Sequence, residues 1–267
     1  MTYKAKAYID QLTGRGSTAF TIGQMQDDLG ITNKAARRML ERLLCNKEIA
    51  TPAKGYYLIL TPEFRELGCL PPNYFIDDLM SHWHKTYYVG LLSAAMFHGA
   101  AHQQPQAVQV MLPAARPDII CGKVVIQFIQ NVSCHKTPVE PLKTPTGALL
   151  VSTAEATAMD LVRFMRRSAG INRVATVIHE LGEKLDKKKL LELTTVFKES
   201  AWVQRLGYLL ETLGHVDTAQ SLLDYLKTTK SRMIPLVPYL GIDNAEKCKK
   251  WRIYINANVE SDLDDTE

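Results

Sequence analysis

Apolar side chains in the first thirty residues recur every three or four positions, and short polar breaks separate them into segments. This period predicts amphipathic helices. The first segment ends at Gly14. A second begins at Thr21 and Gln24, whose T-x-x-Q spacing is that of a capping box, and it ends at Gly30. The apolar positions of these two expected helices are Tyr8, Ile9, Leu12, Met25 and Leu29.

A third helical segment follows directly, and Thr32 is the residue type expected at its N-cap. Residues 48–61 then alternate around a turn at Pro52–Gly55, which predicts a hairpin. Three helices and a hairpin in this order are the elements of a winged helix-turn-helix. The apolar positions of the third helix are Ala36, Met39, Leu40, Leu43 and Leu44.

The periodic pattern is lost after the hairpin, at Pro62, Gly68 and the pair Pro71–Pro72. Proline and glycine clusters of this kind mark connections between domains. We therefore expect a winged helix-turn-helix domain at residues 1–64, a linker and connecting helix at 65–82, and a C-terminal domain at 83–267. Residues 260–267 carry five acids and no base, which is typical of a solvated acidic tail.

Strand patterns open the C-terminal domain. Residues 106–112 alternate, and residues 118–132 indicate two strands joined at Gly122–Lys123. The proline- and threonine-rich residues 135–147 predict a loop. Ser152 and Glu155 then have the spacing of a capping box, so we expect a helix that begins there and closes at Gly170.

Four further helices are predicted around residues 172–181, 187–198, 201–213 and 217–226, and a final strand carries Trp251, Ile253 and Ile255 on one side. The expected fold class is therefore α+β. It consists of an N-terminal winged helix-turn-helix followed by a mixed α/β C-terminal domain with a small sheet and a helical half, to which the final strand returns.

The least polar stretch of the chain is YYVGLLSAAMFHGAA, residues 87–101. A membrane-spanning helix needs about 20 apolar residues, so this stretch is too short, and the N-terminus has no apolar core of a signal peptide. We expect a soluble, cytoplasmic protein without membrane contact, in which this stretch is a scaffold helix. Five irregularly spaced cysteines without a CxxC pair argue against a disulfide framework or a zinc site.

Charge distinguishes the third expected helix from the rest of the chain. The formal net charge is only +4, but the polar face of this helix carries several bases and one acid. In a winged helix-turn-helix this helix enters the DNA major groove, where Arg reads guanine, Asn reads adenine and Lys contacts guanine or phosphate. A solvated face or a protein-interaction module is the alternative interpretation. The expected DNA-binding residues are Thr32, Asn33, Lys34, Arg37, Arg38 and Arg42, with Lys54 and Tyr56 at the wing.

No catalytic pattern stands out in the sequence. GxSxG, P-loop and GxGxxG motifs are missing. His98 and His102 have a metal-ligand spacing, but no glutamate follows His98 and Pro105 indicates that the helix has ended. We expect His98 to be a hydrogen-bonded core residue. The prediction is no enzymatic activity, no catalytic residues, no metal and no cofactor, while an unrecognised hydrolase or nuclease remains an alternative.

Several long segments of the C-terminal domain resemble the AbiEi family, the antitoxins of type IV toxin–antitoxin and abortive-infection systems. They are residues 87–111, TPTGALLVSTAEATAMDLVR, SAGINRVATVIHEL, QRLGYLLETLG and WRIYIN. One departure is Ser168–Gly170, where the family has a double glycine. The N-terminal winged helix fits the same family, so the resemblance covers nearly the whole chain.

The resemblance implies an antitoxin that binds inverted repeats in the promoter of its own operon and represses it. It also implies that the C-terminal domain counteracts a co-encoded nucleotidyltransferase-like toxin, and that the two proteins do not form a stable complex. Two other hypotheses stay open on the residues alone. One is a transcriptional regulator that senses a ligand and has no toxin partner, and the other is an enzyme within the second domain.

Overall fold

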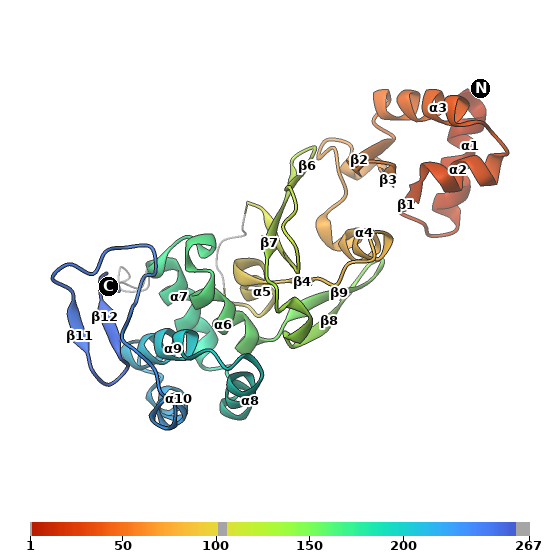
Figure 1. The fold of residues 1–267 in the computed structure, drawn as a ribbon. Helices are drawn as coiled ribbons and strands as arrows, with labels where there is room; N and C mark the ends of the chain where they lie inside the picture. The colour runs from red at the N-terminus through yellow and green to blue at the C-terminus, as the bar shows by residue number, and fades with distance from the viewer. Residues whose placement is uncertain (1, 101–105, 260–267) are drawn as a thin grey trace. The chain divides into compact units, whose positions relative to one another are not determined.

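The computed structural model describes residues 2–100 and 106–259 (Figure 1). Its internal contacts divide the chain into two compact units. The first unit comprises Met1–Tyr87, Gln106–Val132 and Pro141–Leu150, and the second comprises Tyr88–Pro105, Ser133–Glu140 and Val151–Glu267. This division differs from the limits expected at residues 64 and 83, because each unit is assembled from segments that are distant in the sequence. Among the described residues, no helix combines the length and the apolar character that a membrane crossing requires.

The first unit begins with a winged helix-turn-helix. The capping box is formed: Thr21 Oγ1 accepts from the Gln24 amide, and Gln24 Oε1 accepts from the Thr21 amide. Gly30 closes that helix in the left-handed conformation, and Thr32 caps the next one by accepting from the Ala35 amide. The elements are α1 (Thr2–Gly14), β1 (Ala19–Thr21), α2 (Ile22–Leu29), α3 (Asn33–Cys45), β2 (Ile49–Ala53) and β3 (Tyr56–Ile59).

A three-stranded antiparallel sheet of order β1-β3-β2 completes the wing. The sequence pattern predicts the β2–β3 hairpin, which is confirmed, but not β1, because three residues are too few for alternation to show. β1 places Phe20 opposite Tyr57, and their rings stack with centroids 5.5 Å apart. The apolar faces of the three helices and the sheet share one core that includes Tyr8, Met25 and Leu40.

The segment expected to be a linker is part of the first unit's core. Two 3-10 helices, η1 (Pro62–Phe64) and η2 (Pro72–Tyr74), precede α4 (Ile76–His82), which confirms the expected connecting helix. Its apolar side chains are withdrawn from water, so the segment is held by packing. The buried residues are Leu70, Phe75, Ile76, Leu79 and Met80.

Three expected strands, β5 (Val108–Leu112), β6 (Ile119–Cys121) and β7 (Val124–Gln130), are confirmed in the first unit. β7 pairs in parallel with β5 and antiparallel with β6. The turn between β6 and β7 lies at Gly122–Lys123, where the sequence indicates it.

The loop predicted at residues 135–147 is wrong, because β8 (Val139–Thr144) lies within it. Pro141 argues against a strand because proline cannot donate a ladder hydrogen bond. β8 stands at the end of its sheet beside β9 (Gly147–Ser152), and an end strand tolerates proline.

The second unit contains the helical half, and the four helices expected after residue 170 are confirmed. They pack around buried side chains that include Trp202 and Leu206. The helices are α6 (Ala154–Arg163), α7 (Ile171–Gly182), α8 (Lys187–Phe197), α9 (Ser200–Thr212) and α10 (Val216–Thr228), with η3 (Cys134–Lys136) before α6 and η4 (Met165–Ser168) after it.

The start and the end that the sequence predicts for α6, at Ser152 and Gly170, are wrong. Thr153, not Ser152, is the N-cap of α6, because its side chain accepts from the Ala156 amide. Ser152 ends β9, and its hydroxyl is hydrogen-bonded to Thr157 at 2.7 Å. Gly170 does not close α6 but precedes α7 with a φ of 91°, because η4 separates the two helices.

The apolar stretch at residues 87–101 is not one helix. β4 (Tyr88–Val89) pairs in parallel with β9, and α5 (Leu91–Phe97) follows after Gly90. Ala94 and Ala95 are fully buried, which confirms the scaffold role. The prediction of a helix is correct for α5 but wrong for β4, which is a strand.

A second small sheet ends the described chain. It consists of β10 (Ile234–Pro235), β11 (Glu246–Cys248) and β12 (Ile253–Ile255) in the order β10-β12-β11, so the final strand joins its own sheet and does not return to the earlier one. Trp251, just before β12, packs on α9 at Gly207, where a Cβ would lie 2.1 Å from the indole ring. Only glycine leaves room for that contact.

Candidate nucleic-acid interface

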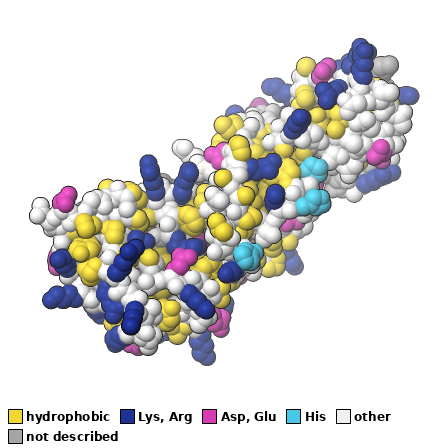
Figure 2. Space-filling view, in the orientation of Figure 1, with side chains coloured by type: hydrophobic (Ala, Val, Ile, Leu, Met, Phe, Trp, Pro, Cys, Tyr) yellow, Lys and Arg dark blue, Asp and Glu magenta, His cyan; other side chains and the backbone are white. Residues whose placement is uncertain are grey.

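The helix α3 has one buried face and one basic face. Ala36, Met39, Leu40 and Leu43 are buried in the core of the winged helix. The opposite face exposes the residues that the sequence predicts for DNA contact, and Figure 2 shows Lys and Arg side chains over this helix. The exposed residues are Thr32, Asn33, Lys34, Arg37, Arg38, Glu41 and Arg42.

The basic side chains of this face are not neutralised within the protein. In the part of the chain that the structure describes, none of Lys34, Arg37, Arg38 and Arg42 forms an ion pair, and neither does Lys54 at the wing. Glu41 is the acid that the helix places among them. Unpaired cations gathered on one face produce a positive potential that attracts an anionic partner.

A groove separates α3 from the wing. Asn33, Arg37 and Glu41 line it from the helix, and Lys54 and Tyr57 line it from the hairpin. The amide nitrogen of Asn33 donates to Gln26 Oε1 on α2 at 3.1 Å, which holds the side chain at the first turn of α3. The structure therefore brings Asn33, Arg37 and Lys54 to one groove, and the other predicted helix residues are exposed on α3 but do not line it: Thr32, Lys34, Arg38 and Arg42.

Tyr56 does not belong to this groove, so its prediction as a DNA-contacting residue is wrong. Its side chain is only 2% exposed, and its hydroxyl donates to Asp78 at 2.7 Å. Burial and the bond to Asp78 raise the pKa of this phenol. Successive side chains of a strand point to opposite faces, so Tyr56 shares the inward face of β3 with Leu58.

Tyr57 is the wing tyrosine that lines the groove, and the sequence interpretation missed it. Burial raises its pKa, while the charge of nearby Arg37 lowers it in part. The sequence did contain a signal for this difference. Residues two apart in a strand share a face, so Tyr56 belongs to the same face as the apolar Leu58, and Tyr57 belongs to the opposite face.

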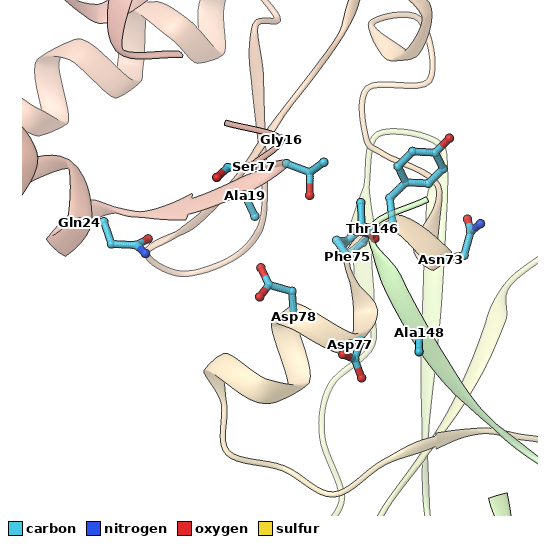
Figure 3. Close-up of a pocket in the computed structure, with 12 residues that line it drawn as sticks. Gly16, Ser17, Ala19, Gln24, Asn73, Phe75, Asp77, Asp78, Thr146 and Ala148 are labelled. Carbon is cyan, nitrogen blue, oxygen red and sulfur yellow. Dashed lines mark hydrogen bonds between the residues drawn. The ribbon is translucent and has the colours of Figure 1, made fainter. Parts of the chain in front are cut away.

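Asp78, which accepts from Tyr56, also lines a polar pocket in the first unit (Figure 3). Asp77 and Asp78 line it from the first turn of α4, opposite Ser17 and Gln24 of the winged helix. Asp78 accepts from the Tyr56 hydroxyl, and Asp77 accepts from the Tyr87 hydroxyl at 2.7 Å. These bonds tie β3 and the end of the connecting segment to α4.

His98 has the hydrogen-bonded role that the sequence predicts. Its Nε2 lies 2.7 Å from the Ser152 carbonyl oxygen, so Nε2–H donates to it, and Nδ1 is 3.6 Å from Glu140. The side chain is partly rather than fully buried, with 12% of its surface exposed. His102 lies outside the described residues. Within those residues, no group of three or more His, Cys, Asp or Glu side chains has a geometry that would hold a metal ion.

Comparison with known proteins connects this chain to one family. Residues 88–212 match the profile of the AbiEi antitoxin C-terminal domain, which confirms the resemblance expected from the sequence. The crystal structure of the Rv2827c protein from Mycobacterium tuberculosis has a similar fold, with a TM-score of 0.70 over 93% of this chain and 90% of that one at 16% identity. No curated protein matches the sequence.

Proposed function

We propose that this chain, an AbiEi antitoxin by its C-terminal domain, represses its own operon by binding inverted repeats in the promoter and counteracts a co-encoded nucleotidyltransferase-like toxin. The winged helix-turn-helix performs the first task and the AbiEi domain performs the second. In this proposal the toxin is a functional partner without a stable complex, both tasks take place in the cytoplasm, and neither uses a catalytic residue, metal or cofactor.

The observation that carries the DNA-binding half is the groove between α3 and the wing with its unpaired cations. In a winged helix-turn-helix the recognition helix enters the major groove with its N-terminal residues at base edges. Asn33 and Lys34 stand in the first turn of α3 and Arg37 in the second. Arg37 and Arg38 suit bidentate contacts to guanine, whereas Lys54 suits a phosphate beside the groove.

The antitoxin half is supported by the family match, which covers β4 to α9. That segment contains the apolar stretch around α5, whose buried alanines and glycine-flanked ends make it scaffold. The toxin class and the way in which it is counteracted come from the family resemblance.

The DNA-binding half is tested by gel-shift titration of the chain's own promoter. We expect Arg37→Ala and Arg38→Ala each to weaken specific binding by roughly 1–3 kcal/mol, the usual value of a bidentate base contact. Lys188→Ala, an exposed cation of α8 in the other unit, is the matched control and leaves the affinity unchanged. Wild-type affinity of both arginine variants would contradict the assignment.

The two halves are separated by testing the full chain in cells that carry a promoter reporter and the toxin gene. The Arg37→Ala/Arg38→Ala double variant is expected to lose repression and to keep protection against the toxin, since α3 lies outside the AbiEi match. Protection that falls together with repression, at equal protein level, would show that the antitoxin task needs DNA binding.

A further inference from the structure

Two cysteines from distant segments meet in the first unit. Cys69 precedes η2 in the connecting segment, and Cys121 is the last residue of β6. The Cys121 thiol donates to the carbonyl oxygen of Gly68, the residue before Cys69, at 3.9 Å, and each of the two thiols shifts the pKa of the other. Cys69 is fully buried and Cys121 is 5% exposed.

The backbone around the two thiols is tightly held. The Lys123 amide donates to the Leu67 carbonyl oxygen at 2.8 Å. At Gly122 a Cβ would lie 2.2 Å from that same oxygen and 2.6 Å from the carbonyl carbon of Gly68, so the β6–β7 turn is pressed against residues 67–68. The backbone segments that carry the two cysteines are therefore in direct contact, because Gly68 precedes Cys69 and Gly122 follows Cys121.

The surroundings distinguish the two thiols. The neighbouring Cys69 thiol and the Thr51 backbone lower the pKa of Cys121 against the opposing effect of burial. The neighbouring Cys121 and burial raise the pKa of Cys69. A thiolate is the reactive form of cysteine, so Cys121 is the nucleophile of the pair.

Cys121 is the thiol of the pair that lines a groove, together with Lys47, Arg65, Glu66 and Lys123. Cys69 does not line this groove, which fits a resolving thiol behind the reactive one.

We propose that Cys69 and Cys121 form a redox-sensitive pair that a hydroperoxide converts to a disulfide between β6 and the connecting segment. The Cys121 thiolate attacks one oxygen of hydrogen peroxide, the O–O bond breaks, and the departing hydroxide takes up a proton as water, leaving a sulfenic acid. The Cys69 sulfur then attacks the Cys121 sulfur, the S–O bond breaks, and the hydroxide leaves as water with the Cys69 proton. Two thiols and one peroxide give one disulfide and two waters.

This modification site is independent of the proposed DNA binding and antitoxin tasks. Cys45 is exposed on α3 and Cys134 is buried, with a pKa that burial raises to about 12. These two residues are internal controls. Cys45 shows how an exposed thiol without a partner cysteine reacts with peroxide, and Cys134 shows how a buried one reacts.

The test treats the full-length protein with hydrogen peroxide, blocks the remaining thiols under denaturing conditions, and maps peptides without reduction. We expect a linked Cys69–Cys121 peptide that reducing agent releases, with the loss of these two of the five free thiols. The Cys134→Ser variant should give the same linked peptide. In Cys69→Ser, a dimedone adduct is expected on Cys121.

The wild-type map decides the proposal even if a serine variant does not fold. If the thiol-blocking reagent still modifies both Cys69 and Cys121 after Cys45 has been oxidised, the proposal is overturned. A dimedone adduct on Cys69 in Cys121→Ser, together with no adduct on Cys121 in Cys69→Ser, would overturn the order of the two thiols.

Discussion

At the scale of single residues, neighbours in sequence have opposite environments. Tyr56 and Tyr57 follow each other in β3, yet the first bonds to Asp78 in the interior and the second lines the groove beside Arg37. Arg37 is exposed, whereas Met39 two positions later is in the core. The environment of a side chain, and not its type, determines which task it can serve.

The two tyrosines should therefore respond differently to substitution. Tyr56→Phe removes a hydrogen bond to a carboxylate and is expected to lower the free energy of unfolding by roughly 1.5–3 kcal/mol. It should leave operator affinity unchanged, while Tyr57→Ala should weaken it. Denaturant titration and gel-shift titration of both variants measure this. Weaker operator binding by a folded Tyr56→Phe would return Tyr56 to the interface.

Asp160 is a fully buried carboxyl in the second unit. Burial raises its pKa to about 6, although the Tyr88 hydroxyl at 2.6 Å and Arg163 at 3.3 Å lower it in part. Arg163 also pairs with Glu199. A carboxyl whose folded-state pKa exceeds the unfolded value of about 3.9 stabilises the fold when it is protonated, and that stability is lost as pH rises through the folded pKa.

We therefore expect the wild type to lose stability relative to Asp160→Asn between about pH 4 and pH 6. A shift of about two pH units corresponds to roughly 3 kcal/mol. Denaturant unfolding of both proteins at several pH values measures the difference. Parallel stability curves for the two proteins across this range would show that Asp160 does not titrate there.

At the scale of elements, the wing and α3 have different parts in the proposed DNA interface. The helix presents residues of base-reading types, and the hairpin adds Lys54 at its turn. In the proposal Lys54 contacts a phosphate, and phosphate contacts carry no sequence information directly.

Lys54→Ala is expected to weaken binding to specific and unrelated DNA alike. Loss of one phosphate contact should reduce the slope of log affinity against log salt by about one unit. Gel shifts at several salt concentrations, with operator and scrambled DNA, give both slopes. A changed base preference at an unchanged slope would instead show that the wing reads bases.

At the scale of the whole molecule, the winged helix is integrated into the first unit. The Tyr56 hydroxyl donates to Asp78 of α4, and β2 packs against β6. The expected domain limit at residue 64 separates the winged helix from these partners. The two compact units have other limits, because they are defined by packing and not by chain order.

Removal of residues 1–61 should therefore destabilise what remains of the first unit. We expect the melting temperature of the fragment 62–267 to fall by roughly 4–8 °C, as a loss of about 2 kcal/mol would produce in a domain of this size. Limited proteolysis should cut residues 106–132 earlier than in the full chain. Equal melting and equal cleavage would support the simple limit at residue 64.

Local structure is the part of this protein that the sequence alone determined. The capping box of Thr21 and Gln24, the cap at Thr32 and the helices α7 to α10 could all be predicted, because their hydrogen bonds join residues three or four apart. The basic face of α3 follows from the same period. The resemblance to the AbiEi family could also be found in the sequence, since it depends on the order of residues.

The tertiary structure decided every feature that depends on pairing between distant segments. The sequence could not show that β8 finds a partner in β9, that Tyr56 meets Asp78, or that Cys69 meets Cys121. It also could not show that the apolar stretch divides at Gly90, because β4 becomes a strand only by pairing with β9. Such contacts are stabilised by burial and hydrogen bonding between segments, and a local pattern of apolar residues does not record which partner each segment finds.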